Sequence, residues 1–279
     1  MDFLAESKVP AAGPGLLSIW PCAAAQFRHS LRLMSPAIIG YSLICIFLAA
    51  IVRGYSGFGF SLLVITALSL VLPPAEIVPS IFMLEVAASL HLLPGIWRDV
   101  HWKSLAPLTL GCLLATPIGV YFLAHVPAPP MQVALALFVL TATVLLWRGF
   151  ALKTMPGPLA STAAGAAAGL ANGAFGMAGP PVVLFYFASP AGNIVGRASL
   201  IAYFVATDVI GLAFQSREGL VTWEAFIRAL IFMPALFAGV WLGARSFKGA
   251  DPAVFRNWVL FILAALAVLT AAKGLVSLW

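Results

Sequence analysis

Long apolar stretches recur along the whole chain. They cover about residues 77–97, 104–124, 131–148, 199–215, 225–245 and 254–277. Each meets or approaches the ~20 residues that a helix needs to cross the hydrocarbon core of a bilayer. Backbone N–H and C=O groups in lipid must be paired within the spanning structure, and a β-barrel would require short segments of alternating polarity. The sequence therefore predicts an all-α polytopic membrane protein.

The composition agrees with this class and excludes others. Of the 279 residues, 62% are hydrophobic and 9% are charged, whereas soluble domains carry about 25% charged residues. The formal net charge is +6, but the basic residues are scattered singly through short loops, which indicates membrane orientation and excludes nucleic acid as a partner. The three cysteines have no paired spacing and the four histidines are dispersed, so we expect no cofactor and no metal site.

Two glycine-rich segments resemble one another. RGYSGFGF at 53–60 is echoed by ANGAFGMAGPP at 171–181, with Gly54 and Gly57 each matched by a glycine 119 residues further on. Downstream, VHW and VTW repeat at nearly the same offset. We therefore predict two internal repeats. Each would open with a glycine-broken helix and continue with three ordinary helices, which makes about eight helical segments.

This repeat divides the chain into four parts. We expect a cytoplasmic N-terminal tail, a first transmembrane repeat, a linker and a second transmembrane repeat, at residues 1–34, 35–150, 151–157 and 158–279. A cleaved signal peptide is the alternative for the tail.

The direction of the repeats depends on the broken segments. If each broken segment crosses the membrane once, the repeats are parallel, and ten basic residues fall inside against four outside. If each is a re-entrant hairpin, the repeats are inverted and the count becomes six against eight. The positive-inside rule favours the parallel arrangement, whereas the length of the first broken segment favours the hairpin.

The broken segments are the predicted substrate site. Clustered glycines weaken helical hydrogen bonding, and unwound backbone at membrane depth persists only where it is buried in protein or lines a wet cavity. A helix that restarts after such a break offers free N–H groups to an anion, and paired breaks in two halves of a chain are typical of transporter sites. The predicted substrate-binding residues are Arg53, Ser56, Gly57, Gly59, Ser61, Asn172, Gly173, Gly176 and Gly179.

Glycines elsewhere in the apolar stretches have a simpler interpretation. They allow two helices to approach closely. We expect this role for Gly111, Gly119, Gly239 and Gly243. For the two glycine-rich segments at 53–60 and 171–181, the alternative to a substrate site is a simple kink in the helix.

Arg53 is the predicted source of positive charge at the site. Its guanidinium offers a fork of donors suited to carboxylate or sulfonate oxygens. Asn172, Ser56 and Ser61 would add neutral donors. The alternative is that Arg53 reaches an interface or pairs with an acid. On sequence alone, Arg53→Ala is expected to abolish uptake while leaving the folded protein abundant.

Two acids lie inside apolar runs. Glu85 and Asp208 occupy nearly equivalent positions of the two repeats, and a carboxyl group in hydrocarbon is costly to ionise. Either is therefore a candidate to carry a coupling ion or proton, and the alternative is a structural partner for Arg53 or for open backbone. His91, two turns after Glu85, is a further relay candidate, with a packed histidine as its alternative.

The paired motifs resemble those of a known transporter family. GYSGFGF and NGAFGMAGPP, followed by the turns LPPAEIVP and SPAGNIVG, are similar to the TauE/SafE sulfite exporter family from about residue 36 onward. The resemblance implies movement of sulfite, sulfonates or similar organic anions across the bacterial inner membrane, with energy from an ion gradient.

The sequence therefore predicts a secondary transporter for a small anion and no enzyme. The expected partners are that solute and the lipid bilayer, and a homo-oligomer is left open. An intramembrane enzyme, with Glu85 and His91 as its nearest approach to a reactive pair, is one alternative. An assembly factor for another membrane complex is the other.

Overall fold

A computed structural model describes residues 35–148, 156–188, 192–246 and 252–277. The chain divides into Met1–Ser35 and Pro36–Trp279, and the fold described below is that of the second unit. The predicted cytoplasmic tail and residues 151–155 of the predicted linker lie outside the described residues.

The described residues form helices and no strand. The α-helices are α2 (Pro36–Ser56), α3 (Phe60–Leu68), α4 (Pro74–Leu92), α5 (Trp102–His125), α6 (Ala128–Arg148), α7 (Pro158–Phe175), α8 (Gly179–Ala188), α9 (Gly192–Arg217), α10 (Trp223–Ser246) and α11 (Pro252–Val276). Two short 3₁₀ helices, η1 (Leu93–Gly95) and η2 (Trp97–Asp99), join α4 to α5. Within the described residues, six helices are long and apolar enough to cross a membrane. The prediction of an all-α polytopic membrane protein is therefore confirmed.

The chain reverses direction between α2 and α3. Gly57 and Gly59, which lie between the two helices, have φ angles of 82° and 90°, in the left-handed region that favours glycine. The Tyr41 hydroxyl near the start of α2 donates to the Ala67 carbonyl near the end of α3, at 3.0 Å. In one continuous helix these two residues would be about 39 Å apart, so α3 runs back along α2 and the two helices form a hairpin.

Hydrogen bonds between helices show which helix ends lie together. The Ser69 carbonyl, just after α3, accepts from Gln132 near the start of α6 at 2.8 Å and from Lys273 near the end of α11 at 3.3 Å. At the other end of α5, the His101 amide donates to Ser199 near the start of α9, at 3.0 Å. α5 begins beside α9 and ends just before the start of α6, so it runs from one end of the unit to the other.

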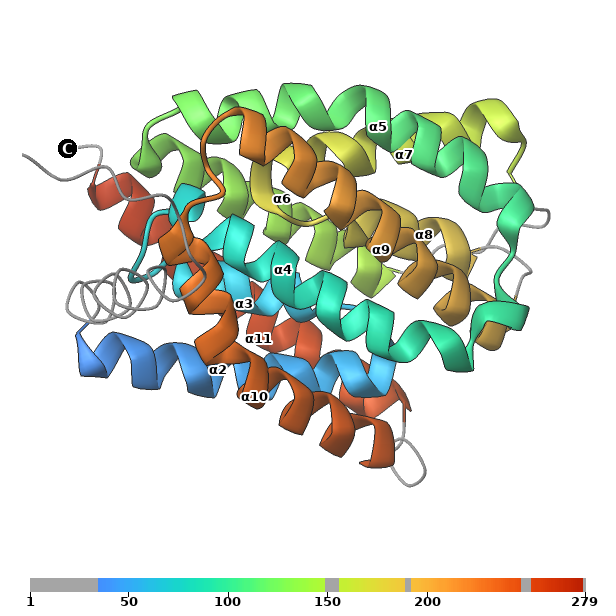
Figure 1. Cartoon of the computed structure of the whole chain (residues 1–279), viewed down its shortest axis with the longest axis horizontal. Coiled ribbons are helices and arrows are strands. Elements are labelled where there is room, and N and C mark those ends of the chain that lie inside the picture. The colour runs from blue at the N-terminus through green and yellow to red at the C-terminus, as the bar shows by residue number, and fades with distance from the viewer. Residues whose placement is uncertain (1–34, 149–155, 189–191, 247–251, 278–279) are drawn as a thin grey trace, which may run out of the picture. The chain divides into compact units, whose positions relative to one another are not determined.

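Two helix pairs with glycine contacts flank the centre of the unit. Figure 1 shows α5 beside α7 along one edge and α2 beside α10 along the opposite edge, with α4 and α9 between them. A side chain at Gly111 or Gly119 would collide with the backbone of α7, and one at Gly239 or Gly243 with α2. The predicted packing role of these four glycines is therefore confirmed.

This packing predicts a strong effect of a small substitution. Gly119→Val would place a branched side chain against the Leu170 carbonyl of α7, and we expect a loss of at least about 2 kcal/mol in stability. Gly40→Val is the matched control, because nothing lies within 4 Å of a side chain built there. Thermal unfolding in detergent should show a lower melting temperature for Gly119→Val alone. Equal melting temperatures would contradict the close packing of α5 on α7.

Candidate functional site

The first hairpin tip is held by its own hydrogen bonds. The Gly57 amide donates to the Arg53 carbonyl at 2.7 Å. The Ser56 hydroxyl donates to the carbonyl of Val52 at 2.8 Å, and the Phe58 amide donates to the Ser56 oxygen at 3.3 Å. These groups therefore stabilise the turn between α2 and α3.

The second tip, between α7 and α8, closes in a similar way. Gly176 has φ 68° and its amide donates to the Asn172 carbonyl at 2.8 Å, while the Met177 amide donates to Ala171 at 3.3 Å. This pattern is a common helix C-terminus. Two of the glycines predicted to bind the substrate, Gly57 and Gly176, therefore donate their amides to helix carbonyls in this structure.

Arg53 is fully buried at the end of α2. Its guanidinium pairs with the Glu85 carboxylate on α4 and donates to the Ser89 hydroxyl one turn further along α4. The Phe204 ring of α9 lies 5.5 Å from the guanidinium carbon. Arg53 is thus paired with an acid, which was the alternative left open by the sequence.

The Glu85 carboxylate contacts the start of α3 in addition to the Arg53 guanidinium. The residue is 3% exposed, and its Oε1 accepts a hydrogen bond from the Ser61 amide at 3.2 Å. A carboxylate at a helix N-terminus is favourable because it complements the helix dipole. The Ser61 backbone, rather than its hydroxyl, therefore makes this contact.

Asn172 of α7 and Asp208 of α9, the counterparts of Arg53 and Glu85 in the second half of the chain, are also buried. Asn172 is fully buried and donates through Nδ2 to the Thr207 carbonyl at 2.9 Å. Asp208 is 3% exposed, and the charged groups acting on its carboxylate are Glu85 and Arg53. We call Arg53, Glu85, Ser89, Asn172 and Asp208 the central polar cluster.

Three of the predicted substrate-binding glycines are not part of the central polar cluster. Gly173 lies on α7 against the Thr116 carbonyl of α5, so it serves helix packing. Gly179 begins α8, and the nearest atom to a side chain built there belongs to Phe204, at 3.8 Å. Gly59 precedes α3 as its N-cap.

His91 does not join the central polar cluster. It is exposed near the end of α4, and its ring lies edge-on to Phe237 of α10 at 5.6 Å. The structure therefore does not bring His91 together with Glu85, the pair on which an intramembrane enzyme would depend.

Sequence reasoning missed Arg197. Its guanidinium donates to the Gly54 carbonyl at the end of α2, at 3.2 Å, and its side chain lies against Gly57. Its position early in α9, where the surrounding sequence is apolar, is the signal that could have found it. Ser89 was missed because a serine in an apolar run gives no comparable signal.

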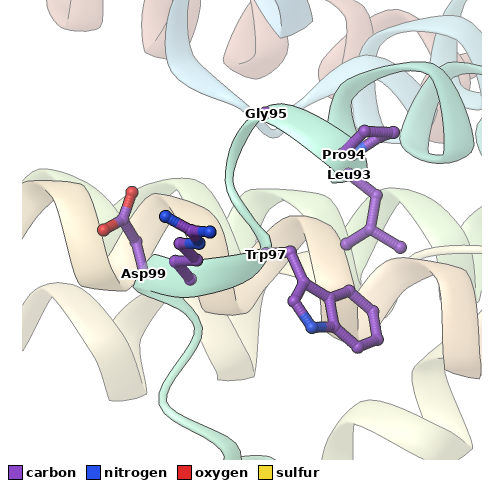
Figure 2. Close-up of a pocket in the computed structure, with 6 residues that line it drawn as sticks. Leu93, Pro94, Gly95, Trp97 and Asp99 are labelled. Atoms are coloured by element: carbon purple, nitrogen blue, oxygen red, sulfur yellow. The ribbon is translucent and has the colours of Figure 1, made fainter.

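A separate cavity lies at the loop between α4 and α5. It is lined by Leu93, Pro94, Gly95, Trp97, Arg98 and Asp99. Figure 2 shows Trp97 and Asp99 extending from this loop in different directions. Its residues are largely exposed and include no predicted substrate-binding residue, so this cavity is distinct from the central polar cluster.

A family profile and a curated relative both identify the same family of membrane transporters. The profile of the family described as "Sulfite exporter TauE/SafE" matches residues 42–270. A protein of Cupriavidus necator named "Probable sulfite/organosulfonate exporter TauE" is 26% identical over 217 residues, which cover 75% of this chain and 84% of that protein. No solved structure matches the chain.

Proposed function

This chain belongs to the sulfite exporter TauE/SafE family, and on that premise we propose that it is a secondary transporter of sulfite, a sulfonate or a similar small organic anion. The family and the membrane-spanning helices make it a multi-pass transporter of the bacterial cell membrane. The name of the relative from Cupriavidus necator supports the class of solute. An ion gradient would supply the energy.

The proposed architecture is a pair of inverted repeats, α2–α6 and α7–α11. Its support comes from reciprocal packing, since α2 packs on α10 as α7 packs on α5, and α4 packs on α10 as α9 packs on α5. A hairpin followed by three crossings gives each repeat an odd number of crossings, which inverts the next repeat. In transporters built this way, the substrate site lies where the repeats meet.

The proposed substrate site is the central polar cluster, and the observation that carries it is the buried arginine. Among the described residues, Arg53 Nε has no hydrogen-bond partner although it is fully buried. An anionic oxygen would supply the missing acceptor, and a guanidinium suits sulfite and sulfonate oxygens. Arg197, at the Gly54 carbonyl, would add positive charge beside the same hairpin tip.

The other predicted residues have supporting roles in this proposal. Ser56, Gly57, Gly59 and Gly176 would hold the two tips, and Ser61 would orient Glu85. Asn172 would hold α7 against α9 through the bond from its Nδ2 to the Thr207 carbonyl, because its buried Oδ1 is an acceptor and does not bind an anionic oxygen. Selectivity would then depend on which anions fit between the two tips.

A flux assay tests this function. The purified full-length protein, reconstituted in vesicles, should move radiolabelled sulfite or a sulfonate faster than protein-free vesicles do. Sulfoacetate, taurine and simple carboxylates complete the panel, and unlabelled substrate should compete. The absence of flux for every anion, together with a copurifying membrane complex, would favour an assembly factor instead.

A further inference from the structure

The two halves of the central polar cluster are chemically different. In the first half, Glu85 receives the Arg53 guanidinium and the Ser61 amide. The residues 119 positions after Arg53 and Ser61 are Asn172 and Pro180. Asparagine carries no charge and proline has no N–H group. Asp208, the acid of the second half, therefore has no equivalent of either partner from its own repeat.

One carboxylate oxygen of Asp208 is accordingly left without a donor among the described residues. Its Oδ2 is buried and has no hydrogen-bond partner among the described residues. The Asn172 amide nitrogen is directed to the Thr207 carbonyl, so the group of Asn172 that remains is an acceptor. A buried carboxylate is stable only when donors or cations surround it, whereas a protonated carboxyl group needs neither.

The groups that interact with Asp208 include no unpaired cation among the described residues. The titratable groups that interact electrostatically with Asp208 are Glu85 on α4, Arg53 on α2, Cys112 on α5 and Tyr203 on α9 itself. Arg53 is the one cation in this set, and Glu85 already pairs with it. Ionisation of Asp208 would thus give the cluster a net charge of −1.

We propose, on the basis of the transport function above, that Asp208 rather than Glu85 binds the coupling proton, and that an anion binds after Asp208 is protonated. Glu85 is the fixed counter-ion of Arg53. With Asp208 neutral, the cluster has no net charge and Arg53 can attract a ligand. An ionised Asp208 would weaken anion binding by on the order of 10- to 100-fold, because a like charge then acts at short range in a protein interior.

The transport step follows from this charge balance. A proton from the water on the open side adds to Asp208 Oδ2, and a monovalent anion then binds beside Arg53. When the site opens to the other side, the anion leaves and the proton returns to water. One proton and one negative charge move together, so transport of a monovalent anion is electroneutral.

Asp208→Asn separates this proposal from a structural role. Asparagine is neutral like the protonated acid, so the variant should still exchange labelled for unlabelled anion. The probe is methanesulfonate, whose single charge does not vary with pH. Wild-type vesicles should approach about tenfold accumulation per unit of pH gradient and ignore the membrane potential. Asp208→Asn should lose the response to pH and respond to the potential instead.

An infrared measurement tests the proton without requiring transport. The wild-type protein at neutral pH should show a carboxylic acid band that Asp208→Asn lacks and Asp208→Glu shifts. Glu76→Gln is the matched control, because the Glu76 side chain is 53% exposed at the start of α4, and it should keep both the band and the pH response.

The outcomes of the two arms are distinct. The role of Asp208 is overturned if a pH gradient still drives anion accumulation by Asp208→Asn. It is also overturned if the wild-type protein shows no carboxylic acid band. A band that survives in Asp208→Asn and disappears in Glu85→Gln assigns the proton to Glu85 and also overturns it. If no vesicle moves any anion, the proposed function fails while the band still decides the protonation of Asp208. If Asp208→Asn does not fold, Asp208→Glu provides the assignment.

Discussion

Replacing Arg53 with alanine is expected to abolish transport and to lower the amount of folded protein. The substitution removes the guanidinium that pairs with Glu85 and leaves that carboxylate buried without its cation. Breaking a buried ion pair in this way costs about 3–5 kcal/mol. The sequence alone predicted that folded protein would remain abundant, and the ion pair changes that expectation.

A double variant separates folding from transport. Arg53→Met combined with Glu85→Gln removes both charges and keeps a side-chain oxygen for the Ser61 amide. Folded yield and melting temperature should recover toward the wild-type values, whereas sulfite flux should remain absent. Arg98→Ala is the matched control, since Arg98 is exposed on the loop between α4 and α5. Wild-type flux in the double variant would remove Arg53 from the substrate site.

Gly176→Ala is expected to have the second large effect. Its φ of 68° costs a non-glycine residue about 1–2 kcal/mol. A methyl group at this position would also press on Ile65, Val78 and Phe82, which fill the space beside the second tip. This overpacking adds about 1–3 kcal/mol, and any adjustment would displace the tip at the central polar cluster. We expect a lower melting temperature and a loss of most anion flux.

Gly219→Ala is the matched control for this variant. Gly219 has φ 70°, and nothing lies within 4 Å of a side chain built there. It therefore shares the backbone penalty of Gly176 without the collision. Melting temperatures and flux measured on the two variants should differ. Equal stability and equal flux would show that packing at the second tip does not affect the site.

The class of the protein was predictable from the sequence. Long apolar runs and few charged residues require membrane helices, because backbone groups in lipid must pair within the segment. The family was recognisable from the paired glycine motifs, and it is confirmed over residues 42–270. The packing glycines on α5 and α10 were also predictable, because a missing side chain within an apolar helix is an advantage at a helix contact.

The contacts across the site were not predictable in the same way. Lipid is as apolar as a neighbouring helix, so an apolar pattern does not specify which face of a helix meets protein. His91 and Glu85 lie on the same helix, yet His91 is exposed and Glu85 is buried, with 3% of its surface exposed. Gly173 and Gly176 are three residues apart, yet one packs on α5 and the other forms the tip.

The sequence by itself determined a helical membrane protein of a known transporter family with two acids in apolar helices. Only the tertiary structure decided that α3 returns along α2 and that Arg53 pairs with Glu85. It also left Asp208 Oδ2 without a donor among the described residues. The physical reason is that composition sets the cost of placing a charge in an apolar medium, whereas the packing of distant segments decides which groups offset that cost.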